Sequence, residues 1–360
     1  MNIFLKTEDE IELMREANLL VGRTLAEVGR HIKEGVTTLF LDKIAEEFIR
    51  DNGAIPTFKG FPNPYGSPFP GSICTSVNDI VVHGIPSEDV TLKDGDVISV
   101  DCGTLLNGFN GDSCYTFCVG DVCEEVKNLL HTTKEALYKG IEVAQAGRHV
   151  GDIGHVIQDC CQAKGYGIVR ELTGHGIGRE MHEDPAIPNY GKRGSGILLK
   201  TGMCIAIEPM VTMGGREIGI LPDRWSIATR DRQPAAHFEH TVAIRAGKAD
   251  ILSSFEEIEL LEMRLPDYLK IRVVCGKGTY IRSIGRDIGE RLGSGAHLLS
   301  LRRTRVGDIR VEDCWKMEDF ERWLESQTLE TEPPSGPIPS EFPFLTPANC
   351  LGEEPLTTLG

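Results

Sequence analysis

The sequence predicts a mixed α/β (α+β) body with antiparallel strand pairs, followed by a small α/β piece and a polar tail. Several long stretches carry apolar residues at the spacing of an amphipathic helix, and several shorter ones have the character of strands. The two kinds do not alternate as they would in a βαβ array, and no repeat period indicates a solenoid. Hairpins within a mixed body are therefore expected.

Two helices are predicted near the amino terminus. Thr7 followed by Glu10 is a capping-box pattern that begins a helix, and Gly35 is a typical stop signal. A second helix is predicted over 39–51, ending near Gly53. The apolar residues that mark the first helix are Ile11, Met14, Val21, Leu25, Val28 and Ile32.

Residues 56–72 are dense in proline and glycine and predict an unusually long loop. Loops of this length inside a compact domain are often functional. The pattern then predicts strands at 96–102, 112–119, 203–208 and 238–245 and helices at 124–145 and 151–164.

The carboxyl-terminal third is predicted to contain a helix, a strand and a second helix. Ser253 and Ser254 favour the start of a helix over "SSFEEIELLEMR", which Pro266 ends. The strand is "YLKIRVVC", because apolar and basic residues alternate along it. The second helix is marked by Ile281, Ile284, Ile288 and Leu292.

The net charge of −16 is unevenly distributed and divides the chain into three parts. Residues 1–262 hold 25 Lys and Arg against 39 Asp and Glu, residues 263–327 hold 13 against 10, and residues 328–360 hold none against five. An acidic body seldom binds nucleic acid, whereas a short basic segment can. We therefore predict a folded body over 1–262, a separate segment over 263–327 and a disordered tail over 328–360.

The cysteine pattern and the amino terminus favour a cytoplasmic protein. None of the eleven cysteines forms a C-x-x-C pair, and the adjacent Cys160 and Cys161 suit no common disulfide framework. The segment "MNIFLKTEDE" lacks a signal-peptide pattern, and no apolar run approaches the length that spans a membrane.

The stretch "VDCGTLLNGFNGDSCYTFCVG" (100–120) places Asp101 and Asp112 on either side of two Asn-Gly pairs. If Asn107-Gly108 forms the two-residue turn, Asp101 lies opposite Cys114 and Asp112 opposite Gly103. The two aspartates then share one face as diagonal neighbours, roughly 7–8 Å apart. A turn at 110–111 would instead separate them.

Two carboxylates on one half-buried face repel each other unless a cation lies between them. Three further residues stand in similar settings. His175 lies between glycines in "TGHGIGREMHEDP", where the backbone can approach a ligand closely, and Glu208 and Glu239 follow or interrupt apolar strands. An oxygen-rich set with one imidazole suits two ions of Mn, Fe, Co or Zn better than a structural zinc.

These residues, together with "FPGSICTSVNDIVVHGIP" (69–86), closely resemble type I methionine aminopeptidase over residues 1 to about 262. The resemblance implies the "pita-bread" fold, in which two pseudo-symmetric α/β halves enclose two divalent metal ions on a central antiparallel sheet. It implies that Asp101 and Asp112 bridge or chelate the metals, that Glu239 bridges them, and that His175 and Glu208 complete the shell of one.

The resemblance also implies roles in catalysis. Water activated between the metals would attack the first peptide bond, and Glu208 would move its proton. His182 would hydrogen-bond the scissile carbonyl oxygen, and His83 would contact the peptide nitrogen. The residues expected to line the methionine side-chain pocket are Tyr65, Phe69, Cys74, Met181 and Trp225.

The implied function is removal of the initiator methionine from nascent proteins with a small second residue. The expected enzyme is a monomer that works on chains emerging from the ribosome. Two alternatives stay open: a proline dipeptidase-like enzyme of the same fold, and an RNA-associated binding protein acting through 263–310.

Residues 271–314 resemble the C-terminal part of the catalytic domain of bacterial tRNA pseudouridine synthase B. Tyr280, Arg282 and Leu301 fall on positions that line the uracil pocket of that family. The catalytic aspartate of the family belongs to a part that has no counterpart in this sequence, so no pseudouridine synthase activity is expected. Any weak RNA binding would involve Arg302, Arg303 and Arg305.

Overall fold

The computed structural model describes residues 2–253, 257–264 and 267–274, together with short stretches between 285 and 310. The chain divides into two units, Met1–Thr279 and Tyr280–Gly360. The second predicted helix (281–292) lies outside the described residues except for Gly285, Ile288 and Gly289, and the predicted disordered tail lies outside them entirely.

The amino-terminal half begins with helix α1 (Glu8–Gly29), which has the predicted capping box. The backbone N–H of Glu10 donates to Thr7 Oγ1, and the N–H of Thr7 donates to Glu10 Oε2. The helix ends at Gly29 rather than Gly35, which instead lies in the following turn at a φ of 84° and donates to Leu92 O. Helix α2 (Thr38–Asp51) follows as predicted.

Both helices cover an antiparallel sheet that carries the two aspartates. The sheet has the order β1-β4-β2, and β5 pairs with the other side of β4. Asn18 of α1 accepts from the backbone N–H of Asp112 at 3.2 Å, so the helix is fastened to the strand at this aspartate. The strands are β1 (Ile55–Pro56), β2 (Ile73–Val77), β4 (Val97–Leu106) and β5 (Phe109–Cys118).

The β4–β5 hairpin has the predicted register. Asp101 lies opposite Cys114, and Gly103 lies opposite Asp112. Asn107 and Gly108 have φ values of 53° and 79°, which is the left-handed pair that a type I′ turn requires. The hairpin prediction is confirmed, and both aspartates lie on the same face of the sheet.

The carboxyl-terminal half has helices α3 (Glu124–Val143) and α4 (Val150–Gln162) packed on further antiparallel strands. A five-stranded sheet has the order β15-β14-β9-β7-β8, and two three-stranded sheets have the orders β13-β10-β6 and β11-β12-β3. The strands are β3 (Ile80–Val82), β6 (Gly167–Ile168), β7 (Gly174–Gly176), β8 (Glu183–Ile187), β9 (Cys204–Ile207), β10 (Met210–Thr212), β11 (Ile218–Ile220), β12 (Ile227–Thr229), β13 (Ala235–His237), β14 (His240–Ala243) and β15 (Asp250–Ile251).

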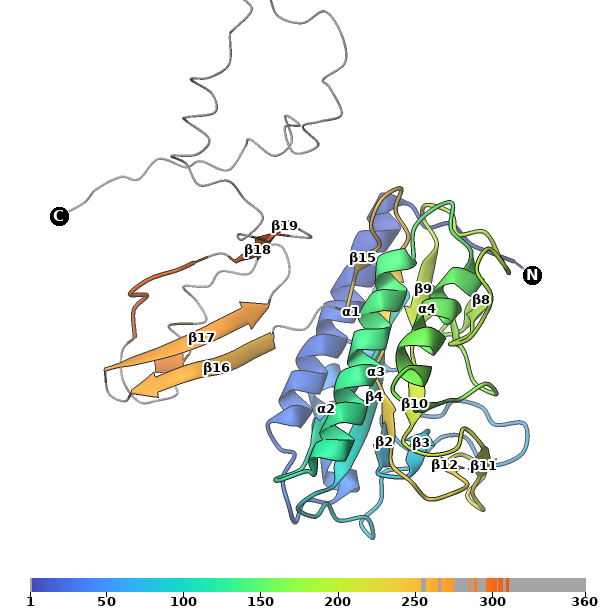
Figure 1. The fold of residues 1–360 in the computed structure, drawn as a ribbon. Helices are drawn as coiled ribbons and strands as arrows, with labels where there is room; N and C mark the ends of the chain where they lie inside the picture. Colours follow the sequence, from blue (N-terminus) through green and yellow to red (C-terminus); the bar gives the residue numbers. More distant parts are fainter. Residues whose placement is uncertain are drawn as a thin grey trace, which may run out of the picture. The chain divides into compact units, whose positions relative to one another are not determined.

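Each half has its own hydrophobic core. In the first, Leu25 and Leu41 of the two helices pack with Val100 of β4. In the second, Leu129 and Ile153 of α3 and α4 pack with Ile205 of β9. Figure 1 shows the long helices α1, α3 and α4 lying across the strands of the body. The opposite face of the strands is thereby left for the functional side chains.

The helix predicted over 253–264 is wrong. Residues Glu257–Arg264 form strand β16, which pairs antiparallel with β17 (Tyr268–Val274). The register places Glu259 opposite Arg272 and Leu260 opposite Ile271, and it shifts between Leu260 and Glu262. This bulge inserts one residue and breaks the two-residue alternation, so the strand period was hidden and the apolar spacing imitated that of a helix. Strand β17 itself was predicted.

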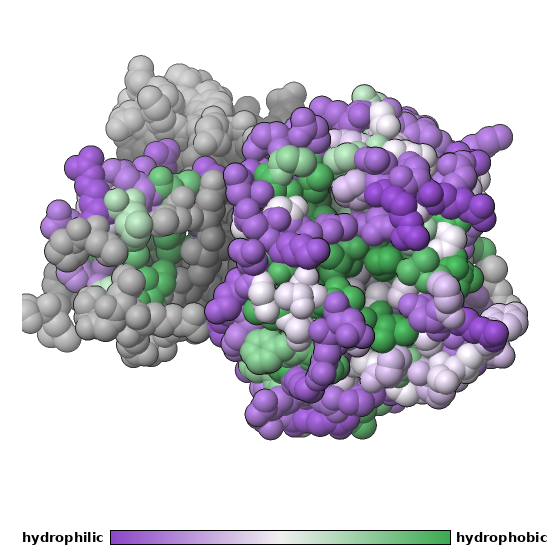
Figure 2. Space-filling model, turned by 90° about the horizontal axis from the view of Figure 1, so that it is seen from below, coloured by the Kyte–Doolittle hydropathy of each residue, from purple (hydrophilic) through white to green (hydrophobic). Residues whose placement is uncertain are grey.

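The surface of the body is mostly hydrophilic on the side shown in Figure 2, with separate apolar patches between polar residues. Among the described residues, no helix combines the length and the apolar character that a membrane-spanning segment needs.

Two short strands, β18 (Arg305–Val306) and β19 (Ile309–Arg310), pair with each other in the second unit.

Candidate metal centre

The five predicted metal ligands come from both halves of the body. Asp101 lies in β4 and Asp112 in β5, whereas His175 lies in β7. Glu208 directly follows β9, and Glu239 lies between β13 and β14. In the described structure, the strands that contribute ligands from one half belong to different sheets from those that contribute ligands from the other half. The site therefore exists only when the two halves come together.

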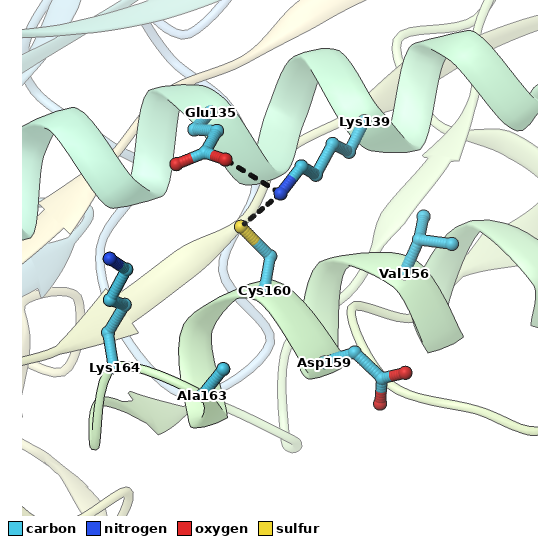
Figure 3. Close-up of a pocket in the computed structure, with 7 residues that line it drawn as sticks. All are labelled: Glu135, Lys139, Val156, Asp159, Cys160, Ala163 and Lys164. Atoms are coloured by element: carbon cyan, nitrogen blue, oxygen red, sulfur yellow. Dashed lines mark hydrogen bonds and ion pairs between the residues drawn. The ribbon is translucent and has the colours of Figure 1, made fainter.

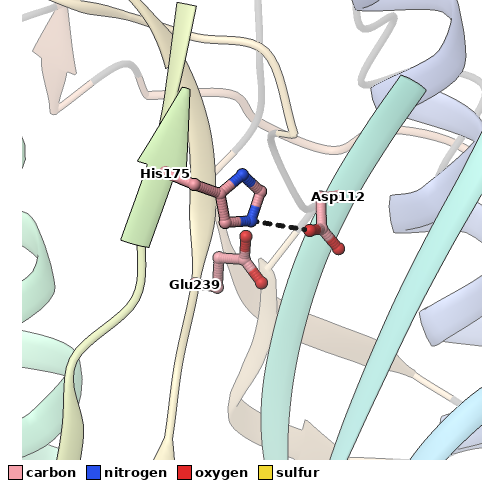
Figure 4. A group of neighbouring side chains, drawn as sticks. All are labelled: Asp112, His175 and Glu239. Atoms are coloured by element: carbon pink, nitrogen blue, oxygen red, sulfur yellow. Dashed lines mark ion pairs between the residues drawn. The ribbon is translucent and has the colours of Figure 1, made fainter. Parts of the chain in front are cut away.

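Four of the five side chains are linked by short distances. His175 Nε2 lies 3.5 Å from Asp112 Oδ2 and 3.8 Å from Glu208 Oε1. One ligand atom from each of Asp112, His175 and Glu239 lies within 4.8 Å of the other two. Figure 4 shows these three side chains pointing toward one another from separate segments of the chain. The spacing is that of groups converging on one small ligand.

Asp101 belongs to the same cluster through its electrostatics. Burial raises the pKa of Asp101 well above its ordinary value, and the negative charges of Asp112 and Glu208 raise it further. Burial likewise raises the pKa of Glu239, followed by the charge of Asp112. Burial also raises the pKa of Asp112, although the nearby His175 opposes this shift.

The donor set fits divalent cations. Within residues 2–253, three carboxylates each bury an oxygen that no hydrogen bond satisfies: Asp101 Oδ1, Asp112 Oδ1 and Glu239 Oε1. Clustered, unsatisfied carboxylates strongly oppose one another's ionisation, and positive charge between them removes both costs. An oxygen-rich set with a single imidazole suits Mn, Fe, Co or Zn. The residues present therefore fit the two metal ions that the sequence predicted.

Glycines beside His175 allow its strand to fit between two neighbours. A Cβ on Gly174 would lie 2.3 Å from Ala206 O, and a Cβ on Gly176 would lie 2.3 Å from Asp184 O. The groups that approach Gly174 and Gly176 closely are therefore backbone carbonyls of neighbouring strands, whereas the sequence suggested a ligand. The imidazole is oriented from its other side, because Nδ1 lies 2.9 Å from Gly176 O and leaves Nε2 for the cluster.

His182 and His83 lie at the border of the cluster. The ring of His182 is 4.4 Å from that of His175 and 5.4 Å from Phe61. Although part of its surface is open to solvent, loss of hydration lowers the pKa of His182 to about 4. His83 adopts a φ of 58°, which is unusual for a residue other than glycine. Burial lowers the pKa of His83.

The predicted side-chain pocket is only partly assembled. Phe69, Cys74 and Met181 are all buried, and Cys74 lies opposite Asp101 in the β2–β4 pair. The ring of Trp225 packs 5.2 Å from that of Phe69. Tyr65 differs, because its side chain is 77% exposed. Its loop is held by its backbone carbonyl, which accepts from Arg224.

His237 is a site residue that sequence reasoning missed. It is 1% exposed, and its Nε2 lies 3.3 Å from Glu208 Oε2. The signal was present in "AAHFEH", because His237 lies two residues before Glu239 and alternate residues of an extended segment share a face. Of the predicted uracil-pocket positions, Tyr280 and Arg282 lie outside the described residues, and Leu301 is 62% exposed.

A separate hollow of about 350 Å³ lies between α3 and α4 and contains none of the predicted site residues. Figure 3 shows Lys139 donating to Cys160 Sγ and pairing with Glu135, at 3.5 Å and 2.6 Å. Two acids and two lysines line this hollow, so its charges balance. Among the described residues, the group of side chains placed to hold a metal ion is the one around Asp112, His175 and Glu239.

Bound Mn²⁺ is expected to raise the thermal unfolding temperature, and to raise it more at pH 7.5 than at pH 5.5. The raised pKa of Asp101 and Glu239 means that the metal-free fold is favoured below the ordinary carboxyl pKa and loses this contribution as pH rises through the raised pKa. Metal competes with those protons. Saturation at a hundred times Kd adds roughly 2.7 kcal/mol. Melting curves in EDTA and in Mn²⁺ across this range test the prediction, and equal increases at every pH contradict it.

Residues 12–246 match metallopeptidase family M24, so the chain belongs to this family. Within it, the body belongs with the methionine aminopeptidases. The methionine aminopeptidase of Clostridium acetobutylicum is 49% identical over 254 residues, which are 71% of this chain and 100% of that protein. The crystal structure of methionine aminopeptidase from Rickettsia prowazekii matches with 39% identity and a TM-score of 0.68, covering 70% of this chain and 100% of that one.

A more distant solved structure, prolidase from Pyrococcus furiosus, shares the fold at 24% identity and a TM-score of 0.56, covering 70% of this chain and 66% of that chain. These likenesses confirm the predicted pita-bread fold. Residues 282–338 match the C-terminal domain of tRNA pseudouridylate synthase B, which confirms the second resemblance. The chain thus joins a metallo-aminopeptidase body to a segment of a different family.

Proposed function

We propose that the protein removes the initiator methionine from polypeptides whose second residue is small. The observation that carries this conclusion is the cluster of buried, unsatisfied carboxylates around His175, within a body that spans the full length of a methionine aminopeptidase relative. The proline dipeptidase alternative has less support, because the prolidase likeness is confined to the fold.

We assign the metal-binding role to Asp101, Asp112, His175, Glu208 and Glu239. Two divalent metal ions, when bound, would supply Lewis-acid stabilisation and lower the pKa of an attacking water. Glu208 is suited to accept the proton of that water, because its carboxylate borders the cluster and lies 3.8 Å from His175 Nε2 and 3.3 Å from His237 Nε2.

His182 and His83 are suited to hold the scissile peptide unit. Because the pKa of His182 is lowered to about 4, its ring is neutral at neutral pH and has one N–H to donate. A neutral donor beside a cationic centre stabilises the developing oxyanion without adding repulsion to the metals. His83, whose pKa is also lowered by burial, would contact the leaving nitrogen.

We place the methionine side chain among Phe69, Cys74, Met181 and Trp225. Sulfur and aromatic edges suit an unbranched thioether. Met181 lies above Gly103, where a Cβ would approach its Cε to 3.0 Å, so the strand carrying Asp101 forms the floor of this region. Tyr65, with its exposed side chain, would act only at the rim.

The proposed setting is the cytoplasm, at the ribosome, with the protein acting as a monomer on nascent chains. We further propose that residues 1–262 carry the activity and that 263–327 adds no pseudouridine synthase activity. An RNA-associated role of 263–310 is the alternative for this segment, where β17 carries exposed Lys270 and Arg272. Salt-dependent RNA binding that requires residues 263–360 would support it.

The test is a comparison of short peptides in the presence of Mn²⁺. Met-Ala-Ser and Met-Gly-Met are expected to release methionine. Met-Lys-Ser, whose second residue is bulky, and Ala-Pro, which lacks the methionine side chain, are expected to react at least about a hundredfold more slowly, a difference of about 2.7 kcal/mol. Release should stop in chelator and return with metal. Faster cleavage of Ala-Pro than of Met-Ala-Ser would favour the prolidase-like alternative.

A further inference from the structure

Three buried hydroxyls connect strand β5 to the segment that carries Glu239. We call Ser113, Thr116 and Thr241 the hydroxyl seam. Ser113 and Thr241 are 0% exposed and Thr116 is 2% exposed. Each donates to a main-chain carbonyl on the opposite side, so the seam crosses from one half of the body to the other.

Two bonds of the seam are reciprocal and end on the metal-ligand residues themselves. Ser113 Oγ, one residue after Asp112, donates to Glu239 O at 2.6 Å. Thr241 Oγ1, two residues after Glu239, donates to Asp112 O at 2.8 Å. Each carboxylate residue is therefore fastened by its carbonyl to a hydroxyl that neighbours the other carboxylate.

A third bond extends the same arrangement to His237. Thr116 Oγ1 donates to His237 O at 2.7 Å and accepts from the His237 N–H at 3.1 Å. In its turn His237 Nε2 lies 3.3 Å from Glu208 Oε2. The seam thus reaches Glu208, the candidate proton acceptor, as well as Asp112 and Glu239.

In the described structure no strand pairing sets this register. Strand β5 pairs with β4, whereas β13 pairs with β10 and β14 pairs with β9 and β15, so the facing segments belong to different sheets. The Glu239 N–H donates to Cys114 O at 3.0 Å, and the hydroxyls continue the connection on both sides of that bond.

We propose that Ser113 and Thr241 are positioning residues that hold Asp112 and Glu239 at metal-binding distance across the two halves. This proposal rests on the proposed function in one respect only, namely that the group bound by these carboxylates is a divalent metal ion. A carbonyl that is held by a buried hydroxyl cannot drift without leaving the donor unsatisfied, which is costly. Pre-organised ligands bind metal more tightly because binding need not assemble them.

The test compares Ser113→Ala, Thr241→Val and Thr241→Ser with Thr133→Val. Thr133 is a matched control because it is 0% exposed and donates to a carbonyl, Leu129 O, at 2.8 Å, but inside helix α3. For each full-length protein, Mn²⁺ affinity is measured by calorimetry and by loss of the free-ion EPR signal. Thermal unfolding in EDTA reports stability without metal.

Mn²⁺ binding is expected to weaken roughly tenfold in Ser113→Ala and in Thr241→Val, as for other residues that orient metal ligands. Thr241→Ser, which keeps the hydroxyl, is expected to stay within about twofold of the unchanged protein. Thr133→Val should lower the EDTA unfolding temperature without changing Mn²⁺ affinity.

An unchanged Mn²⁺ affinity in both Ser113→Ala and Thr241→Val would overturn the proposal, as would equal weakening in Thr133→Val. If Thr241→Val does not fold, Ser113→Ala and Thr241→Ser decide the question. The measurement does not use peptide hydrolysis. If the variants weaken Mn²⁺ binding as expected but the unchanged protein releases no methionine, the proposed function is contradicted and the positioning role stands.

Discussion

Replacing Asp112 by asparagine is expected to lower methionine release at least about a thousandfold, because the residues of such a centre act as one unit. Asp112 lies 3.5 Å from His175 and within the same 4.8 Å group as Glu239, so its loss removes the centre of the ligand set. Mn²⁺ binding, followed by calorimetry, should be lost together with activity measured on Met-Ala-Ser.

The same change is expected to stabilise the metal-free protein at neutral pH. The charge of Asp112 raises the pKa of both Asp101 and Glu239, so removing it relieves repulsion among buried acids. Asp121→Asn serves as the control, because it makes the same chemical change at an exposed position. Full activity of Asp112→Asn would contradict the assignment. So would an unfolding temperature in EDTA that is lower than that of the unchanged protein.

Replacing His182 by alanine is expected to lower kcat about a hundredfold to a thousandfold, which is the usual loss when a donor to a developing oxyanion is removed. Mn²⁺ affinity should stay nearly unchanged, since we assign His182 to the substrate rather than to the metal. This separates it from His175, whose ring is only 4.4 Å away. Replacing His175 by alanine should weaken Mn²⁺ binding and activity together.

The comparison needs steady-state kinetics and a metal titration on the same preparations. His155→Ala is the matched control, because this histidine pairs with Asp159 at 3.2 Å on α4 and belongs to no part of the proposed site. A His182→Ala variant that loses Mn²⁺ binding as strongly as His175→Ala would show that His182 holds the metal instead. An unchanged kcat would remove it from the mechanism.

Much of this site could be predicted because its information is local. The Asn-Gly turn fixes the partner of every residue in the hairpin, so the shared face of Asp101 and Asp112 followed from the sequence and was confirmed. Burying an unpaired carboxylate beside an apolar strand costs free energy, and this indicated that Glu208 and Glu239 are candidate functional residues. The helix predicted over 253–264 failed for the same local reason, since one bulge residue disguised the strand period of β16.

The sequence by itself determined which side chains stand on buried strands and which aspartates face each other, because turn geometry and residue periodicity act over a few positions. Only the tertiary structure decided that His237 approaches Glu208 and that Ser113 and Thr241 fasten opposite halves. It also left the side chain of Tyr65 exposed. The hydrogen bonds of Ser113 and Thr241 join residues more than a hundred positions apart. Their partners, like that of His237, are set by the packing of two separate cores rather than by any neighbouring residue.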